Sequence, residues 1–149
     1  MATFTGQAGL IKIGTDIVAE LRSFTIEQTQ DTVETTAMQA AGSSSTAVSR
    51  AYKPGLSTFT ITGDVYFDGD DTAQAALEGG LDEAGLGTAL TFKVYPAGVG
   101  ASDGKAFYGN AIMTSFSISS SVDGAVEASF SAQGTDALIM NDADAVVTA

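Results

Sequence analysis

Residues 58–67 read Thr-Phe-Thr-Ile-Thr-Gly-Asp-Val-Tyr-Phe, with apolar and polar side chains in alternation. Successive side chains of a β-strand leave opposite faces of the sheet, so a period of two predicts a strand with one buried and one wet face. The expected buried side carries Phe59, Ile61, Val65 and Phe67, and the expected wet side carries Thr58, Thr60, Thr62 and Asp64.

Three further stretches alternate in the same way, namely residues 23–30, 112–119 and 126–133. Together the four stretches predict a sheet with one apolar and one polar face. The expected apolar sides are Phe24 and Ile26 in the first stretch, Ile112, Thr114, Phe116 and Ile118 in the second (with Met113 on the polar side), and Val126, Ala128, Phe130 and Ala132 in the third.

The polar face consists almost entirely of hydroxyl side chains with three carboxylates, Glu27, Asp64 and Glu127, and the four stretches contain neither Lys nor Arg. Two interpretations stay open on composition alone. Thr suits strands in general, so the face could be the ordinary wet side of a β-sandwich. Alternatively, the face lacks cations because it was selected not to hold a polyanion.

Composition bounds the function classes. The 149 residues, 44% of them hydrophobic, are enough for one domain with one core. A formal net charge of −12, from 18 acidic and 6 basic residues, argues against a protein that grips nucleic acid but not against one past which nucleic acid slides. The absence of Cys and His excludes disulfides, Cys or His metal sites and His-based catalysis.

Neither a signal peptide nor a membrane span is visible. Residues 1–7 lack a basic segment followed by an apolar one, and no apolar run approaches the roughly 18–20 residues that a transmembrane helix needs. We therefore expect a protein that stays soluble in a cytoplasm and has no membrane partner.

A single domain over residues 1–149 is expected, without internal repeats. Strands fill residues 9–30, with a turn at residues 14–16 and a second strand from Ile17 onward. Residues 31–55 have neither a helical nor a strand period, and connections of such length are usually functional or disordered. This segment is either a loose surface loop or, as we favour, an arm that orders against a neighbouring subunit.

The acidic run after the strand at residues 56–67 predicts a helix start rather than a calcium loop. Counted from Asp68, the sixth loop position holds Ala73 instead of Gly and the twelfth holds Gly79 instead of Glu. We place a helix at residues 71–85, capped by Asp70 or Asp71, with Ala73, Leu77, Leu81 and Ala84 on its buried stripe and a stop at Gly85.

Strands are expected again at residues 89–96, 105–120 and 124–134, and the Asp123-Gly124 pair predicts a tight hairpin turn between the last two. Residues 136–149 carry acidic side chains and no basic one. They form either a frayed terminus or a second docking arm.

Several stretches, in this order, carry a resemblance that covers about residues 9–135. They are Gly9-Leu-Ile-Lys-Ile-Gly with Ile17-Val-Ala-Glu-Leu-Arg-Ser-Phe-Thr-Ile, then Pro54-Gly-Leu-Ser-Thr-Phe-Thr-Ile-Thr-Gly-Asp-Val-Tyr-Phe-Asp before an Ala-rich helix, then Tyr108-Gly-Asn-Ala-Ile-Met-Thr-Ser-Phe-Ser-Ile-Ser and Gly124-Ala-Val-Glu-Ala-Ser-Phe-Ser-Ala-Gln-Gly-Thr. The series, taken as a whole, resembles the tail tube (major tail) proteins of long-tailed bacteriophages.

The resemblance implies a mainly β fold, a β-sandwich or partial barrel of antiparallel strands with one flanking helix. Six copies would form a ring with a closed inner β-barrel, and rings would stack into a tube. It implies a structural virion protein that is no enzyme and has no cofactor, assembled in the host cytoplasm and carried in the phage tail. Implied partners are further copies, the tape-measure, tail-terminator and distal-tail proteins, and double-stranded DNA in transit without specific binding.

The strand count agrees with a channel for DNA. Open sheet edges on a monomer invite aggregation, and closing strands of several subunits into one barrel removes them. With four strands from each of six subunits, about 24 strands at roughly 4.8 Å spacing give a diameter of about 37 Å before tilt. After about 10 Å is subtracted for side chains, a duplex of about 20 Å fits.

Two sets of site residues follow from the strand phase and the resemblance. The lumen-facing set is Ser23, Thr25, Glu27, Thr58, Thr60, Thr62, Asp64, Ser115, Ser117, Ser119, Glu127, Ser129, Ser131 and Gln133. The set expected at contacts between subunits or rings is Asp31, Val33, Met38, Val48, Arg50, Tyr52, Lys53, Leu138, Ile139 and Met140.

Other function classes compete with this one. The carboxylate pairs Asp70/Asp71 and Asp82/Glu83 would be candidates for acid–base catalysis, but neither has a nucleophile or an electrostatic partner beside it in the sequence. A secreted adhesin or pilus-like β-sandwich would suit Ser/Thr-rich strands, but the missing leader counts against it. A type VI secretion tube-like protein, which shares the fold by the same resemblance, is a third alternative.

Overall fold

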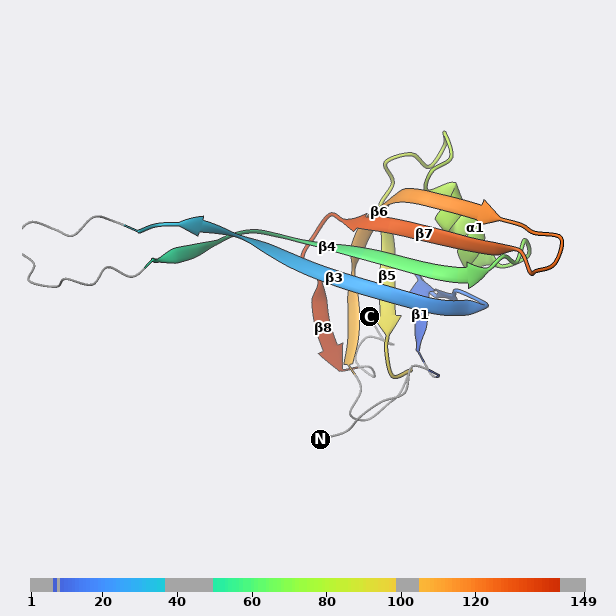
Figure 1. The fold of residues 1–149 in the computed structure, drawn as a ribbon, viewed down its shortest axis with the longest axis horizontal. Helices are drawn as coiled ribbons and strands as arrows, with labels where there is room; N and C mark the ends of the chain where they lie inside the picture. Colours follow the sequence, from blue (N-terminus) through green and yellow to red (C-terminus); the bar gives the residue numbers. More distant parts are fainter. Residues whose placement is uncertain (1–6, 8, 37–49, 99–104, 143–149) are drawn as a thin grey trace, which may run out of the picture.

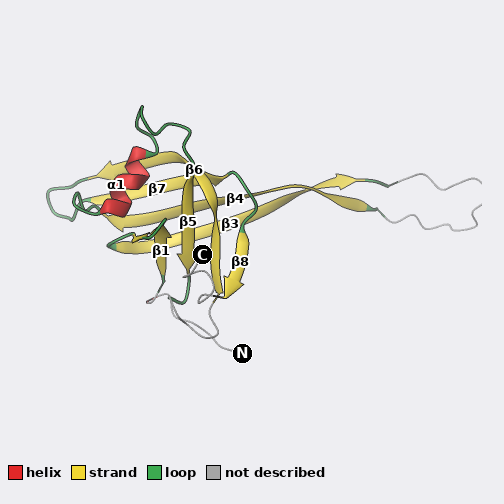
Figure 2. Ribbon diagram, turned by 180° about the vertical axis from the view of Figure 1, so that it is seen from behind, coloured by secondary structure: helices red, strands yellow, loops and turns green. Residues whose placement is uncertain are grey.

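The structure of the chain, a computed structural model, describes residues 7, 9–36, 50–98 and 105–142. Within these residues one helix accompanies strands that pair only in antiparallel fashion, as expected for a mainly β fold (Figures 1 and 2). The elements are β1 (Leu10–Ile13), β2 (Asp16–Ile17), β3 (Leu21–Glu34), β4 (Tyr52–Tyr66), α1 (Thr72–Gly79), β5 (Leu90–Tyr95), β6 (Lys105–Ser119), β7 (Glu127–Gly134) and β8 (Ile139–Asp142).

The strands form a continuous sheet in the order β2-β1-β5-β6-β7-β4-β3, with β8 beside β6. β6 joins two layers, because its first half pairs with β5 and β8 and its second half pairs with β7. Figure 1 shows β3, β4, β7 and the second half of β6 in front, and β1, β5 and β8 running across them behind. Figure 2 shows α1 on the rear side, beside β1, which it contacts. The result is a β-sandwich with a flanking helix.

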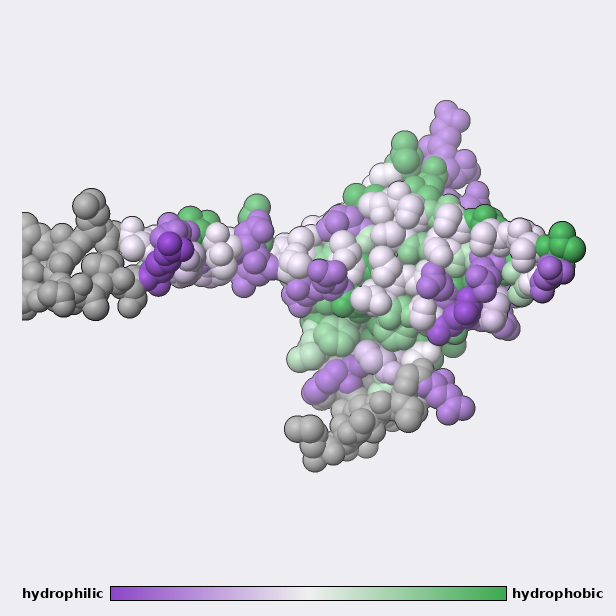
Figure 3. Space-filling view, in the orientation of Figure 1, coloured by the Kyte–Doolittle hydropathy of each residue, from purple (hydrophilic) through white to green (hydrophobic). Residues whose placement is uncertain are grey.

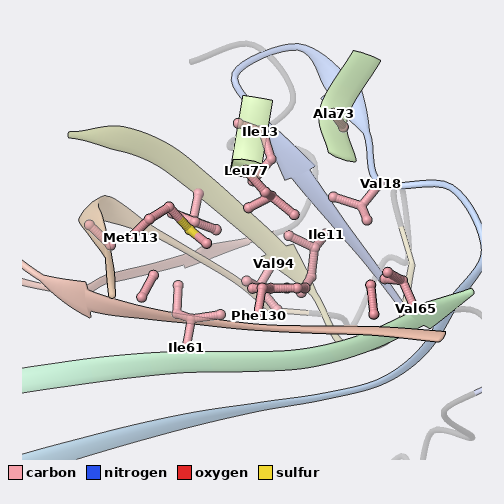
Figure 4. Close-up of a cluster of buried hydrophobic side chains, with 14 of the residues drawn as sticks. Ile11, Ile13, Val18, Ile61, Val65, Ala73, Leu77, Val94, Met113 and Phe130 are labelled. Atoms are coloured by element: carbon pink, nitrogen blue, oxygen red, sulfur yellow. The ribbon is translucent and has the colours of Figure 1, made fainter. Parts of the chain in front are cut away.

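The core lies between the two layers (Figure 4). Ile61 and Phe130 enter it from the front layer, Ile11 and Val94 from the rear layer, and Leu77 from α1, and none of these side chains is more than 2% exposed. Burial of one such side chain contributes roughly 1.5–3 kcal/mol. The helix therefore closes one end of the sandwich by adding its apolar stripe to the core.

The helix is shorter than the expected span of residues 71–85, because α1 ends at Gly79. Its start agrees with the sequence, since Asp71 is the N-cap. The chain turns back after α1, and Gly85 packs so tightly that a Cβ there would lie 2.0 Å from the carbonyl oxygen of Gly79. Ala84 consequently lies outside the helix and is exposed, instead of belonging to the buried stripe.

The strand expected from Ile17 onward is interrupted at Glu20, whose φ of 57° turns the chain from one layer to the other. α1 holds this turn. The Asp71 carboxylate accepts a hydrogen bond from the backbone N–H of Ala19 (3.0 Å), and the Gln74 amide donates to the Ala19 carbonyl oxygen (3.1 Å). Gln74 is 2% exposed, so a buried and fully used polar side chain ties the helix to the start of β3.

The hairpin of β3 and β4 is longer than expected. Residues 31–34 and 52–55, which sequence reasoning assigned to an irregular loop, continue both strands, and Glu34 pairs with Tyr52. Figure 1 shows this part projecting beyond the sandwich as a two-stranded ribbon. Both faces of the ribbon are exposed, so neither selects apolar residues and no period of two results. The rest of the expected arm, residues 37–49, lies outside the described residues.

The first half of β6 has the opposite phase to the expected one. Met113 was predicted on the polar side but is 3% exposed within the core, whereas Ile112 pairs with Gln133 on the polar side. A β-bulge between Met113 and Ser115 inserts Thr114 as an extra residue. The bulge shifts the alternation by one position and restores the predicted phase from Ser115 onward.

Two C-terminal expectations also need correction. β6 and β7 are joined by residues 120–126 instead of a tight turn, because neither Asp123 nor Gly124 adopts the positive φ that a two-residue Asp-Gly hairpin requires. Residues 139–142 of the acidic tail are not frayed, since they form β8 and pair with β6, whereas the alternative of a second docking arm stays a prediction. Residues 143–149 lie outside the described residues.

Phe59 sets the spacing between β4 and its neighbours. Its ring is 1% exposed and lies against two glycines, Gly134 of β7 and Gly109 of β6. A Cβ on Gly134 would lie 2.3 Å from the ring, and one on Gly109 would lie 2.9 Å from it. Both positions therefore require glycine to make room for the ring.

Gly134→Ala is expected to lower the free energy of unfolding by about 1–3 kcal/mol, because the buried ring of Phe59 has no space into which to move. Chemical denaturation of the unassembled chain measures this change. Gly79→Ala is the control: its Cβ would meet nothing within 4 Å, and an alanine in the helix leaves stability unchanged or raises it by up to about 1 kcal/mol. Equal stability of the two variants would contradict the role assigned to Phe59.

Candidate functional site

Cross-strand pairing places all fourteen residues of the predicted lumen-facing set on one face of the front layer. Residues paired across neighbouring strands lie on the same side of a sheet, so chains of pairs define rows across it. All fourteen are exposed or half-buried, and none is buried. From one end to the other the rows are Tyr66, Glu127 and Ser119; Ser23, Asp64, Ser129 and Ser117; Thr25, Thr62, Ser131 and Ser115; Glu27, Thr60, Gln133 and Ile112; and Thr29 and Thr58.

We call this surface the Ser/Thr face. Figure 3 views it from the front, and most of the sandwich body is pale there, which corresponds to side chains that are neither strongly hydrophilic nor strongly hydrophobic. A hollow of about 250 Å³ opens near its centre over Gly63 and Phe130. Gly63 itself pairs with the inward-facing Phe24 and Phe130, and a Cβ there would lie 2.6 Å from the Phe130 ring, so this position needs glycine to make room for that ring in the core.

Hydrogen bonds between side chains join the neighbouring strands of the Ser/Thr face. Asp64 accepts from the hydroxyl of Ser23 on Oδ2 (3.2 Å) and from the hydroxyl of Ser129 on Oδ1 (2.6 Å). Gln133 donates to the hydroxyl of Thr58 and to the carbonyl oxygen of Phe59. These bonds engage both oxygens of the Asp64 carboxylate, so the face offers mainly hydroxyls, together with the exposed carboxylate of Glu27.

Arg22 belongs to the Ser/Thr face although sequence reasoning did not place it there. It lies two positions before the inward-facing Phe24, so strand phase would turn it toward the core. A bulge between Leu21 and Ser23 reverses its direction, and its Nη1 lies 2.6 Å from Oε1 of Glu127. Its guanidinium also lies 4.9 Å from the centre of the Tyr66 ring. The bulge left no signal in the sequence that would have shown this.

The layer that carries the Ser/Thr face has two open edges in the described part of the chain. β3 pairs only with β4, and residues 112–119 of β6 pair only with β7. Ile118, on the second of these edges, is 52% exposed. Unpaired backbone groups with an exposed apolar side chain beside them are suited to pairing with another strand.

The residues predicted at contacts between subunits fall into three groups. The ribbon carries Asp31, Val33, Tyr52 and Lys53, and Arg50 lies just before it; all are exposed. β8 carries the exposed Ile139 and Met140, whereas Leu138 packs against the core of its own chain. Met38 and Val48 lie outside the described residues.

The described residues contain no group of three or more His, Cys, Asp or Glu suited to a metal ion. Of the carboxylate pairs considered above, Asp71 caps α1, and Asp82 accepts from the backbone N–H of Glu83. Burial raises the pKa of the Tyr95 hydroxyl, which has no hydrogen-bond partner in the described part of the chain and lies in the rear layer, away from the Ser/Thr face. No described helix is long and apolar enough to cross a membrane.

Comparison with solved structures finds the same fold in particle tails. A chain of the virion of a native gene transfer agent (GTA) particle has a TM-score of 0.72 and 22% identity, over 93% of this chain and 99% of that one. A chain of the tail of the empty GTA particle, refined with C6 symmetry, has a TM-score of 0.71 and 22% identity, again over 93% of this chain and 99% of that one. The chain of the SPP1 tail tube has a TM-score of 0.63 and 18% identity, over 95% of this chain and 81% of that one.

No curated protein sequence matches the chain significantly. The sequence model of a family described as phage tail tube protein, however, matches residues 3–139. This match confirms the resemblance seen in the sequence and sets aside the enzyme and adhesin interpretations. The chain belongs to the phage tail tube protein family and is a structural component of a tail, not an enzyme.

Proposed function

We propose that six copies of this chain close into a ring with the Ser/Thr face lining its channel, that rings stack into a tube, and that double-stranded DNA passes through the tube. The observation that carries the proposal is the position of the Ser/Thr face between two open edges, β3 and residues 112–119 of β6. If β3 of one copy pairs with this part of β6 in the next, every copy satisfies both edges and the four-stranded layers join into one barrel.

The number six is supported by the C6 symmetry of the GTA particle tail, whose chain has the same fold. It also agrees with the strand geometry, because about 24 strands enclose a duplex after side chains are counted. The exposed Ile118 would be covered at the edge-to-edge contact, which removes an apolar side chain from water.

Electrostatics supports passage rather than binding of DNA. Proteins that hold DNA do so mainly through Lys and Arg contacts to phosphates, and each contact releases counterions and strengthens attachment. The Ser/Thr face has three carboxylates, and its one arginine is paired with Glu127. Together with the net charge of −12, such a wall offers no unpaired cation to which a DNA phosphate would bind.

The ribbon of β3 and β4 suits a contact with the next ring. Val33 and Tyr52 project from its two faces and are 55% and 52% exposed. Apolar side chains on both faces of a ribbon that has left its own core are buried only by another molecule. β8, with the exposed Ile139 and Met140, suits a second contact of this kind, with another ring or with the proteins at the two ends of the tail.

Thr60→Lys/Ser117→Lys is expected to leave the tube intact and to reduce DNA delivery by about tenfold or more, because lysines facing the channel would form contacts with phosphates. Electron microscopy of the particles checks assembly, and transfer of DNA to the host checks delivery. The control, Thr60→Glu/Ser117→Glu, adds side chains of similar length without positive charge and is expected to deliver DNA normally. Normal delivery by the lysine variant would mean that the charge of this face does not matter for transit.

Val33→Ser/Tyr52→Ser is expected to leave the stability of the single chain within about 0.5 kcal/mol of the wild type, because both side chains are exposed, but to shorten or abolish tubes. Denaturation measures the first effect, and sedimentation with electron microscopy measures the second. Leu86→Ser is the control, since Leu86 is 71% exposed but lies away from the ribbon. Tubes of normal length from the ribbon variant would exclude the ribbon as a stacking contact.

A further inference from the structure

Arg22 is the only cation that the described residues place among the rows of the Ser/Thr face. Its position is a consequence of the bulge at the start of β3, without which strand phase would direct it to the core. In a ring with rotational symmetry, the same residue of every copy lies at the same height. Arg22 would therefore occur as a belt of six guanidinium groups around the channel.

Two residues contact the guanidinium group of Arg22. Its Nη1 lies 2.6 Å from Oε1 of Glu127, and its Cζ lies over the Tyr66 ring, 4.9 Å from the ring centre. The contacts come from three different strands, because Arg22 is on β3, Tyr66 on β4 and Glu127 on β7. The carboxylate takes the place that a phosphate oxygen would otherwise fill on the same donor group.

Stability alone gives little reason for this arrangement. The side chains of Arg22 and Glu127 are 43% and 46% exposed, and exposed ion pairs contribute little to folding because water and salt screen them. The pair is, however, well suited to cancelling a positive charge on a surface that otherwise has none.

We propose that Glu127 is the residue that keeps Arg22 from capturing DNA in the channel, so that the Arg22–Glu127 pair sets the low affinity of the wall for phosphates. The inference rests on the proposed function, since it requires that the Ser/Thr face line the channel. Removal of the Glu127 charge would convert the belt of six arginines into a site where a DNA backbone is retained.

The test uses assembled tubes of Glu127→Gln and a short fluorescent DNA duplex as the probe. Pelleting of duplex with tubes is measured at 50 and 200 mM salt. Wild-type tubes are expected to retain little duplex at either concentration. Glu127→Gln tubes are expected to retain it at low salt and to lose about ten- to fortyfold in apparent affinity at high salt, as two or three phosphate contacts per duplex would require.

Two controls separate unmasking of Arg22 from a mere loss of negative charge. Glu27→Gln removes one carboxylate from the same face without an arginine partner and is expected to behave as the wild type. Arg22→Gln/Glu127→Gln removes both members of the pair and is expected to abolish the retention gained by Glu127→Gln. Equal retention by the Glu27 and Glu127 variants, or retention by the double variant, would overturn the proposal.

The outcome is separable from that of the proposed function. A density map of the wild-type tube with the Ser/Thr face on the outside would refute the proposed function itself. The same map with this face inside, together with no retention by Glu127→Gln tubes, would refute only the role of Glu127. If Glu127→Gln alone fails to assemble, tubes mixed from wild-type and variant chains give the same test, because each variant copy exposes one Arg22; absence of retention there would also overturn the proposal.

Discussion

Burial of one face of the layer formed by β3, β4, β7 and the second half of β6 is the constraint on which the remaining features depend. Phe59, Ile61 and Phe130 enter the core from this layer and are at most 2% exposed. Because side chains alternate along a strand, fixing these residues inside fixes their neighbours outside. Core packing therefore determines which side of the layer the Ser/Thr face is on. It does not constrain which polar side chains that face carries, so their chemistry can be selected for function.

The local period of two explains why the face could be predicted from sequence. Alternation needs only neighbouring residues, and all fourteen predicted residues share the face. β-bulges limit this reasoning, since each adds a residue without a compositional mark. One bulge moved Met113 into the core, and another turned Arg22 outward. The sequence pattern thus predicted the hydroxyl-rich composition of the face, but it did not predict that Arg22 lies on it.

Features that depend on contacts between distant segments were also beyond the sequence pattern. β8 exists through pairing with the first part of β6. The ribbon is held by pairing of β3 with β4 alone, without a buried face to impose a period. In each case the strand pairing joins residues too far apart in the sequence to appear in the short window over which hydrophobic periodicity is judged.

Hydroxyl side chains also ease the assembly that we propose. Each copy has a net charge of −12, and symmetry would bring equivalent residues of all copies together around a narrow channel. A wall of carboxylates would repel DNA but would also make the copies repel one another across the ring. Ser and Thr keep the wall hydrated with little charge, and pairing Glu127 with Arg22 cancels one carboxylate in each copy. A mildly acidic, hydroxyl-lined face thus meets two opposing requirements, since the ring must close while its wall holds no phosphate.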